Sequence, residues 1–398
     1  MIDLRPKVPD DLPFAVTEYR DRHARVRVEM AARGMDLLYV TSPANLFYLT
    51  GYEAIWYPNR LPLGAVIDRL RPDVIFFDWS RHAGYVNTRV LCDEVVLIDY
   101  GHAPEQVADA FAELGWRHRI VGIEWGSSNP AAPVMSSVAD LLRQRGATLV
   151  SGDWVVDQVR LYKSPAEIER IRRAAVMADG AMLQLQGDLR PGMTELEVSA
   201  RLAALLAGLG SEVAAMAPLV NSGPTAWSAT HGFPTRRRLE AGDVVAVDCC
   251  AVVDRYHANL GRTFAVGAPN RRAAQMLEHA AGSIVELQRA ARLGDGPEMA
   301  AAAADRSVRE GISAENVWWI GGYSLGIAFP PSWVGHTYLA NDGLEKCRLL
   351  PGYVSNYETV FIDEHDGFEA GSIDTVLMTE QGLEVLSNMP RGLLPSAV

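Results

Sequence analysis

The hydrophobic pattern changes character near residue 163, and this change constrains the fold more than any other feature. Before it, stretches with helical periodicity alternate with short apolar runs. The helical stretches are 19–34, 104–114 and 132–146, and the runs are 36–40, 64–67, 73–77, 94–98 and 119–123. Such alternation favours a mostly parallel or mixed sheet with helices packed against it, which is an α/β unit.

The change itself begins with a helix-start signal. A capping box from Ser164 to Glu167, with proline at the first helical position, predicts a long helix there. A second capping box, from Thr194 to Glu197, predicts another helix start. Beyond the second helix, short β-type runs follow, separated by Gly and Pro turns; they are 244–248, 262–266, 359–362 and 375–378.

These patterns predict two domains with a boundary just before the first capping box. Residues 1–160 form the α/β unit. Residues 161–398 form an α+β unit, with helices on one side of a curved antiparallel sheet. A chain of 398 residues is long enough for two domains of this size.

Composition excludes several classes of protein. Hydrophobic residues make up 48% of the chain and charged residues 22%, which is typical of a globular protein. A formal charge of −12 argues against a nucleic-acid partner and favours attraction of a cationic ligand. Four cysteines are too few for a disulfide scaffold, and no apolar run is long enough to span a membrane. We therefore expect a cytoplasmic protein without a membrane or nucleic-acid partner.

Three segments of the second half concentrate residues that can carry chemistry. The first, 221–248, contains His231 and ends at Asp248; the second is 256–264; the third, 322–358, ends at Glu358. Together with segment 43–51 and the junction 163–169, they resemble the creatinase/aminopeptidase P/methionine aminopeptidase superfamily, whose fold is called pita-bread. The resemblance covers nearly the whole chain. It implies a creatinase-type N-terminal α/β domain and a C-terminal pita-bread domain.

The sequence departs from that superfamily at the positions that hold metal. The metallopeptidases of the superfamily bind two metal ions with two Asp, one His and two Glu side chains. Matched by motif, these positions are Asp248, Asn259, Tyr323, Glu358 and Ile373. Asn is a neutral amide, Tyr is protonated at pH 7 and Ile has no donor, so three of the positions cannot coordinate as required. Asp374 cannot replace Ile373, because neighbours on a strand point to opposite faces. We expect no metal and no other cofactor.

Loss of the metal leaves two interpretations of the resemblance. One is a non-catalytic scaffold. The other is the solution of creatinase, in which the same fold hydrolyses a C–N bond without metal and a His at the position of His231 acts as acid and base. Segments 255–263, 322–333 and 386–393 also resemble ectoine hydrolase, a metal-free relative that opens a cyclic amidine, although Asp248 stands where that enzyme has Glu.

The leading hypothesis is therefore an enzyme: a metal-independent hydrolase that cleaves a C–N bond of a small amidine, guanidine or cyclic amide. The substrate is expected to be cationic or zwitterionic. His231 is the general acid/base, while Glu358 and Asp248 orient water and hold the cationic nitrogen, or one of them attacks the carbon. The alternatives are an Xaa-Pro-type dipeptidase with a degenerate or mononuclear metal site, and a non-catalytic ligand-binding protein.

Further residues are expected to contact the substrate. The candidates in the second half are Tyr323, Asn259, His257, Trp333 and Arg262. For Arg262 we favour a pair with an internal carboxylate over a substrate contact. Cys249 and Cys250 are interpreted as buried packing, and Trp318 and Trp319 as core or interface residues.

The first half contributes an expectation about assembly. The metal-free relatives are homodimers in which the N-terminal domain of one subunit covers the catalytic cleft of the other. Segment 51–57 lies in the corresponding lid region and contains Trp56 and Tyr57, which are suited to stacking on a planar cation. The resemblance therefore implies a homodimer with Trp56 and Tyr57 among the substrate-binding residues.

Overall fold

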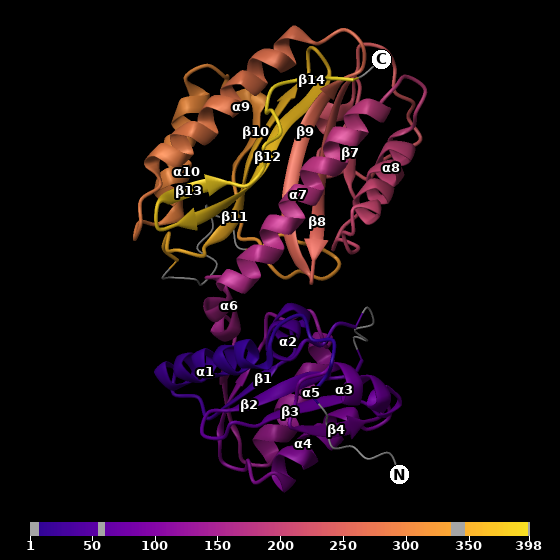
Figure 1. The fold of residues 1–398 in the computed structure, drawn as a ribbon. Helices are drawn as coiled ribbons and strands as arrows, with labels where there is room; N and C mark the ends of the chain where they lie inside the picture. Colours follow the sequence, from indigo (N-terminus) through magenta and orange to yellow (C-terminus); the bar gives the residue numbers. More distant parts are fainter. Residues whose placement is uncertain (1–7, 55–59, 336–346, 397–398) are drawn as a thin grey trace. The chain divides into compact units, whose positions relative to one another are not determined.

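The computed structural model describes residues 8–54, 60–335 and 347–396. The chain divides into two compact units, residues 1–160 and 161–398, drawn in indigo to purple and in magenta to yellow in Figure 1. Among the described residues, no helix is both long enough and apolar enough to cross a membrane.

The N-terminal unit is a mixed sheet with helices packed on it. In chain order its elements are α1 (Val16–Ala32), β1 (Leu37–Val40), α2 (Pro43–Thr50), β2 (Gly64–Asp68), β3 (Val74–Trp79), α3 (Ala83–Arg89), β4 (Glu94–Ile98), α4 (Ala103–Glu113), β5 (Ile120–Ile123), α5 (Ala132–Gln144), β6 (Thr148–Ser151) and α6 (Val155–Arg160). The strand order is β4-β3-β2-β1-β5-β6. Strand β2 is antiparallel to both neighbours, and the other pairs are parallel.

Apolar side chains of the sheet and the helices α4 and α5 form the core of this unit. Tyr39, Phe77 and Phe111 contact one another with ring centroids 5.8–6.0 Å apart, and Val138 of α5 belongs to the same cluster. The strands expected from the apolar runs are all present. Strand β6 was not predicted, because it lies at the sheet edge and its half-exposed residues form no apolar run.

The C-terminal unit contains a larger, curved sheet. Its elements are α7 (Pro165–Asp188), α8 (Glu195–Gly208), β7 (Leu219–Ser222), η2 (Ala226–Ser228), β8 (Val244–Val253), β9 (Tyr256–Ala265), α9 (Arg271–Ala290), α10 (Pro297–Arg309), η3 (Ala314–Asn316), β10 (Val317–Gly321), β11 (Val354–Asp363), β12 (Phe368–Thr379), β13 (Gly382–Val385) and β14 (Leu394–Pro395). The order β10-β11-β12-β9-β8-β7 is antiparallel throughout, while β13 pairs with β12 and β14 pairs in parallel with β9.

Both predicted capping boxes are present in this unit. Ser164 Oγ accepts the N–H of Glu167 at 3.3 Å, and a Glu167 carboxylate oxygen accepts the N–H of Ser164 at 2.9 Å. Thr194 and Glu197 make the same reciprocal pair at the start of α8. These bonds satisfy amide groups that have no partner within the helix.

Helices α7 and α9 cover one face of the sheet. The Tyr256 hydroxyl at the start of β9 donates to Glu167 of α7 at 2.7 Å, and the Tyr357 hydroxyl of β11 donates to Ser283 of α9 at 3.0 Å. Because neighbours on a strand point to opposite faces, Glu358 points to the other face of the sheet.

The central strands are much longer than predicted. Strands β8, β9 and β11 have 10 residues each and β12 has 12, whereas the apolar runs indicated about half of that. The predicted runs leave out polar residues such as Asn259 and Asp374, which belong to the strands because their side chains find partners inside the protein. A polar residue therefore does not mark a strand end in this sheet.

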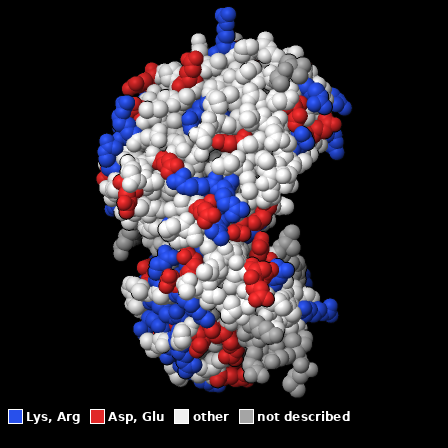
Figure 2. Space-filling view, in the orientation of Figure 1, with Lys and Arg blue, Asp and Glu red and all other residues white. Residues whose placement is uncertain are grey.

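Charged groups are intermixed on the molecular surface. On the face shown in Figure 2, Lys and Arg side chains lie among Asp and Glu side chains over both units. Close pairs of opposite charge include Arg172 with Glu384 and Arg309 with Asp305. Exposed pairs of this kind contribute little to stability, so the fold depends on the buried sheets.

Candidate functional site

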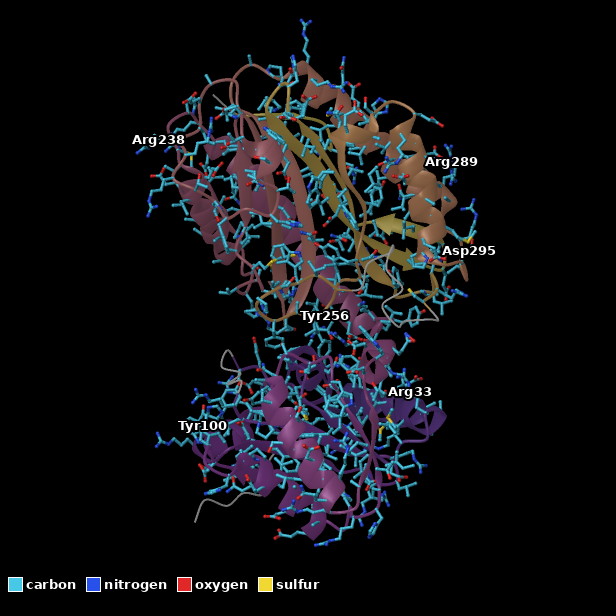
Figure 3. The ribbon with its side chains drawn as sticks, turned by 180° about the vertical axis from the view of Figure 1, so that it is seen from behind. Arg33, Tyr100, Arg238, Tyr256, Arg289 and Asp295 are labelled. Atoms are coloured by element: carbon cyan, nitrogen blue, oxygen red, sulfur yellow. The ribbon has the colours of Figure 1, made fainter. Side chains whose placement is uncertain are left out.

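A cavity of about 610 Å³ lies on the sheet face opposite to α7 and α9. In Figure 3, which shows the molecule from behind, the strands stand in front of α7, and side chains crowd the face between the outlying Arg238 and Arg289. The strands from β10 to β7 in the sheet order all line the cavity, with Trp318 (β10), Glu358 (β11), Ile373 (β12), Gly261 (β9), Asp248 (β8) and Asn221 (β7) among the lining residues. The volume suits a small-molecule ligand.

Two acidic side chains are held in the cavity by two amide side chains. Asn259 Nδ2 donates to Asp248 Oδ1 at 2.6 Å, and Asn356 Nδ2 donates to Glu358 Oε1 at 2.5 Å. The amides are linked to each other, since Asn356 Nδ2 also donates to Asn259 Oδ1 at 2.9 Å. The sequence analysis missed Asn356, although it lies two residues before Glu358 and therefore on the same strand face.

Burial changes the proton affinity of this acidic pair. It raises the pKa of Glu358 to about 7, against the opposing effect of hydrogen bonds with Tyr323 and Asn356. Burial, followed by repulsion from Glu358, raises the pKa of Asp248 well above its ordinary value. Near neutral pH the pair therefore carries less than two negative charges, and a carboxyl group can both take up and release a proton.

Tyr323 lies beside the Asp248–Glu358 pair. Its hydroxyl accepts a hydrogen bond from Trp333 Nε1 at 3.0 Å and lies 3.4 Å from Asn259 Oδ1. Burial, with Glu358 and Asp248 next, raises the pKa of Tyr323 well above its ordinary value. The phenol is therefore neutral at pH 7. Both Tyr323 and Trp333 line the cavity, and the expected contact with a substrate stays a prediction.

His231 enters the cavity from the loop that follows η2. Its backbone has a φ of +69°, in the left-handed region that a residue with a side chain seldom adopts. Its ring meets Trp318 edge to face, with centroids 4.9 Å apart. Trp318 is 39% exposed and lines the cavity, so it is not a core residue; the alternative expectation, an interface position, stays a prediction. Strand alternation alone did not place it in the cavity, because a bulge interrupts β10 beside it.

Glu369 is a third cavity carboxyl that the sequence analysis missed. Asn221 Nδ2 and Thr230 Oγ1 each donate to its Oε2 at 2.9 Å, and Thr230 directly precedes His231. Burial raises the pKa of Glu369 to about 7. Alternation along β12 places Glu369, Gly371 and Ile373 on one face, and this pattern was readable from the sequence.

Two expected substrate contacts, Asn259 and His257, have their polar atoms occupied inside the protein. Asn259 is not among the cavity-lining residues: both amide hydrogens go to Asp248 and Cys249, and its oxygen faces Asn356 and Tyr323, so its polar atoms are used to position Asp248. His257 is buried, with Nε2 accepting from the Ala215 N–H at 3.1 Å and Nδ1 2.9 Å from the Arg255 carbonyl. Both ring nitrogens are therefore occupied inside the protein.

Arg262 borders the cavity, but its guanidinium points to the other face of the sheet. Its guanidinium lies 2.8 Å from Asp374 Oδ1 and donates to the carbonyl of Ile373, and both ionic side chains are buried. The favoured interpretation, a pair with an internal carboxylate, agrees with this geometry. Cys249 and Cys250 are buried, and burial raises the pKa of both thiols, in agreement with a packing role. Trp56 and Tyr57 lie outside the described residues.

The five positions matched to metal ligands do not fit a pair of metal ions. An N–H donor of Asn259 points at Asp248, where a bridging carboxylate would be needed. Ile373 presents hydrocarbon to the cavity and occupies the space beside Gly261, where an added Cβ would lie 2.6 Å from Ile373 Cγ1. Asp374 points to the helix-covered face and pairs with Arg262 and Arg391, as the alternation argument predicts.

Comparisons with known proteins agree with this architecture. Metallopeptidase family M24 matches residues 169–380, and the creatinase/prolidase N-terminal domain matches residues 22–162. An ectoine hydrolase of Halomonas elongata is 25% identical, covering 96% of this chain and 98% of its own. An Xaa-Pro dipeptidase of Pyrococcus furiosus is 30% identical over 61% of this chain and 67% of its own.

A solved structure shows the same fold over nearly the full length. Recombinant prolidase from Thermococcus sibiricus superposes with a TM-score of 0.82 at 20% sequence identity, covering 95% of this chain and 99% of the prolidase. The match extends over both units and includes the antiparallel sheet that carries the cavity. The chain therefore belongs to metallopeptidase family M24, a family of hydrolases, and carries a creatinase/prolidase N-terminal domain.

Proposed function

We propose that the protein is a metal-independent hydrolase that cleaves a C–N bond of a small amidine, guanidine or cyclic amide. One observation carries the proposal: the Asp248–Glu358 pair is bridged by amides and not by further carboxylates, and it shares its cavity with His231. The similarity to an ectoine hydrolase over 96% of the chain supports a substrate of this class.

The cavity groups can divide the work of hydrolysis. His231 takes a proton from water while the water oxygen bonds to the substrate carbon, and then delivers the proton to the departing nitrogen as the C–N bond breaks. Glu358 orients the water, and Asp248 hydrogen-bonds the cationic nitrogen. In the second route, a carboxylate oxygen attacks the carbon and the nitrogen leaves with a proton from His231. Water then hydrolyses the resulting mixed anhydride, or its amidinyl equivalent, which frees the carboxylate and returns a proton to His231.

Neutral Tyr323 suits either route. Its phenol hydroxyl lies beside the acidic pair. Attack on the substrate carbon moves negative charge onto the oxygen or nitrogen that is double-bonded to it, and the hydroxyl can donate a hydrogen bond to that atom. Trp333 fixes the hydroxyl by donating to it.

Metal analysis combined with a turnover panel tests the proposal. We expect purified protein to hold no stoichiometric transition metal and to open cyclic amidines or cleave guanidines at a rate that a chelator leaves unchanged. One or two bound metal ions per chain with cleavage of Xaa-Pro dipeptides would instead establish the dipeptidase alternative, which similarity to the Pyrococcus enzyme favours. Absence of turnover with both substrate classes would leave the non-catalytic scaffold.

A further inference from the structure

Glu369 combines deep burial with an unused oxygen. Its side chain is 8% exposed and lines the cavity. Oε2 accepts both hydrogen bonds, from Asn221 and Thr230, whereas no described residue donates to Oε1. Oε1 is also partly exposed: several described side-chain atoms are fully buried without a hydrogen-bond partner, and Oε1 is not one of them. The carboxyl is thus held through one oxygen and presents the other to the cavity.

Among the described residues, the direct hydrogen-bond partners of Glu369 provide no compensating positive charge. Its two hydrogen-bond donors are a neutral amide and a neutral hydroxyl. Among the described lining residues, Arg262 is the one Lys or Arg, and its guanidinium is bound to Asp374 on the other face of the sheet. Asp248 and Glu358 add acidic groups to the same cavity, so a bound cation would relieve repulsion there.

We propose that Glu369 forms a second, cation-binding subsite of the cavity, which holds an ammonium group of the substrate while the Asp248–Glu358 pair holds the scissile C–N group. This inference rests on the function proposed above. It narrows the substrate class to small molecules with an ammonium group at one end, the scissile group at the other, and a short apolar body between them.

The sheet sets the distance between the two subsites. Glu358 pairs with Ile373, and Glu369 lies four residues before Ile373 on β12, which corresponds to about 13 Å along the strand. Ile373 contributes an apolar wall and Gly371 leaves the strand surface between the two positions without a side chain. An extended chain of a few methylene groups with a nitrogen group at each end fits this arrangement.

Binding of matched guanidines tests the subsite without requiring turnover. The probes are agmatine with its one-carbon-shorter and one-carbon-longer homologues, 1-butylguanidine, which lacks the ammonium group, and 4-guanidinobutyrate, which carries a carboxylate instead. Binding is measured by titration calorimetry at pH 8, where Glu369 is mostly ionised. Of agmatine and its two homologues, we expect the one of best length to bind at least about tenfold more tightly than 1-butylguanidine. 4-Guanidinobutyrate should bind most weakly.

Two variants assign the preference to this carboxyl. Glu369→Gln should reduce the preference for the ammonium group to about threefold or less, whereas Glu380→Gln, an exposed carboxylate between β12 and β13, should leave it unchanged. Thermal melts verify that both variants are folded. The subsite is wrong if the wild-type protein shows no preference, if none of the ammonium probes binds, or if Glu369→Gln keeps the preference.

The same experiment separates this inference from the proposed function. A preference that depends on Glu369, in a protein that cleaves no C–N bond of the panel, would support the subsite and contradict the hydrolase. Cleavage of guanidines or amidines without any preference for the ammonium group would support the hydrolase and contradict the subsite.

Discussion

At the scale of single residues, the cavity is defined by carboxyl groups that the protein keeps out of water. Glu358 and Glu369 both have a pKa raised to about 7 by burial. Each is held by neutral donors, and neither forms an ion pair with a described residue. Such groups cost stability in the free protein, so their retention in a ligand cavity points to a functional role.

Substitution of His231 tests the acid/base assignment. His231→Ala should lower kcat by about 100- to 10,000-fold without loss of stability, because the side chain is exposed to the cavity and carries the proton transfer. Steady-state kinetics and thermal melts give the two readouts. His279→Ala, on α9, is the control and should be nearly silent. Equal kcat in both variants would place the acid/base elsewhere, with His336 outside the described residues as the next candidate.

Glu369 also predicts a pH dependence of stability. Its pKa is about 7 in the folded protein and near the ordinary 4.5 when unfolded, so the folded state binds the proton more tightly. The free energy of unfolding should therefore fall as pH rises from about 4.5 to about 7 and stay level above that range. Glu369→Gln removes this pH-dependent contribution. Relative to wild type, the free energy of unfolding of the variant should therefore rise by up to about 3 kcal/mol from pH 5 to pH 8.

Urea unfolding at the two pH values measures this difference. Glu380→Gln is the matched control, because it removes an exposed carboxylate and should shift stability equally at pH 5 and pH 8. A Glu369→Gln variant that loses more stability relative to wild type at pH 8 than at pH 5 would contradict the assigned direction of the pKa.

At the scale of elements, the contact between β9 and β12 shows how the sheet packs around Ile373, which occupies a metal-ligand position of the resembled family. Gly261 of β9 pairs with Ile373 of β12, and the missing side chain of Gly261 makes room for Ile373. A small residue on one strand and a branched one on the next thus fill the place beside Asp248 where the resemblance expects a second glutamate. This packing makes the cavity floor apolar between its acidic ends.

Overpacking of this contact gives a testable coupling. Gly261→Ala should destabilise the protein by about 1–3 kcal/mol, since the new Cβ would lie 2.6 Å from Ile373 Cγ1. In the Ile373→Ala background the same substitution should cost less than about 1 kcal/mol, because the obstructing atoms are gone. Denaturant unfolding of the four proteins measures the cycle; additive effects would show that the two side chains do not compete for space.

At the scale of the whole molecule, the resemblance to metal-free relatives predicts self-association. We expect a homodimer at micromolar concentration, with twofold symmetry. Analytical ultracentrifugation gives the mass directly. Trp56→Ala should raise KM at least several-fold while the protein stays folded and dimeric, if the lid region contributes to substrate binding. A monomer at that concentration, or unchanged kinetics in the variant, would contradict a substrate site that two subunits share.

The sequence by itself determined the class of fold and much of the chemistry of the site. Local signals sufficed for this: apolar runs predicted five of the six described strands of the first half, and two capping boxes located the starts of α7 and α8. Motif matching also showed which metal-ligand positions had changed, since residue identity alone decides whether a side chain can donate to a metal.

Only the tertiary structure decided what these side chains touch. Glu369 meets Asn221, 148 residues away, and Arg262 meets Asp374, 112 residues away. Such partners are set by strand order and register, to which distant parts of the chain contribute jointly. The direction of the Asn259 amide, the burial of His257 and the open oxygen of Glu369 all follow from that register, because hydrogen-bond partners and water exclusion exist only once the sheet has assembled.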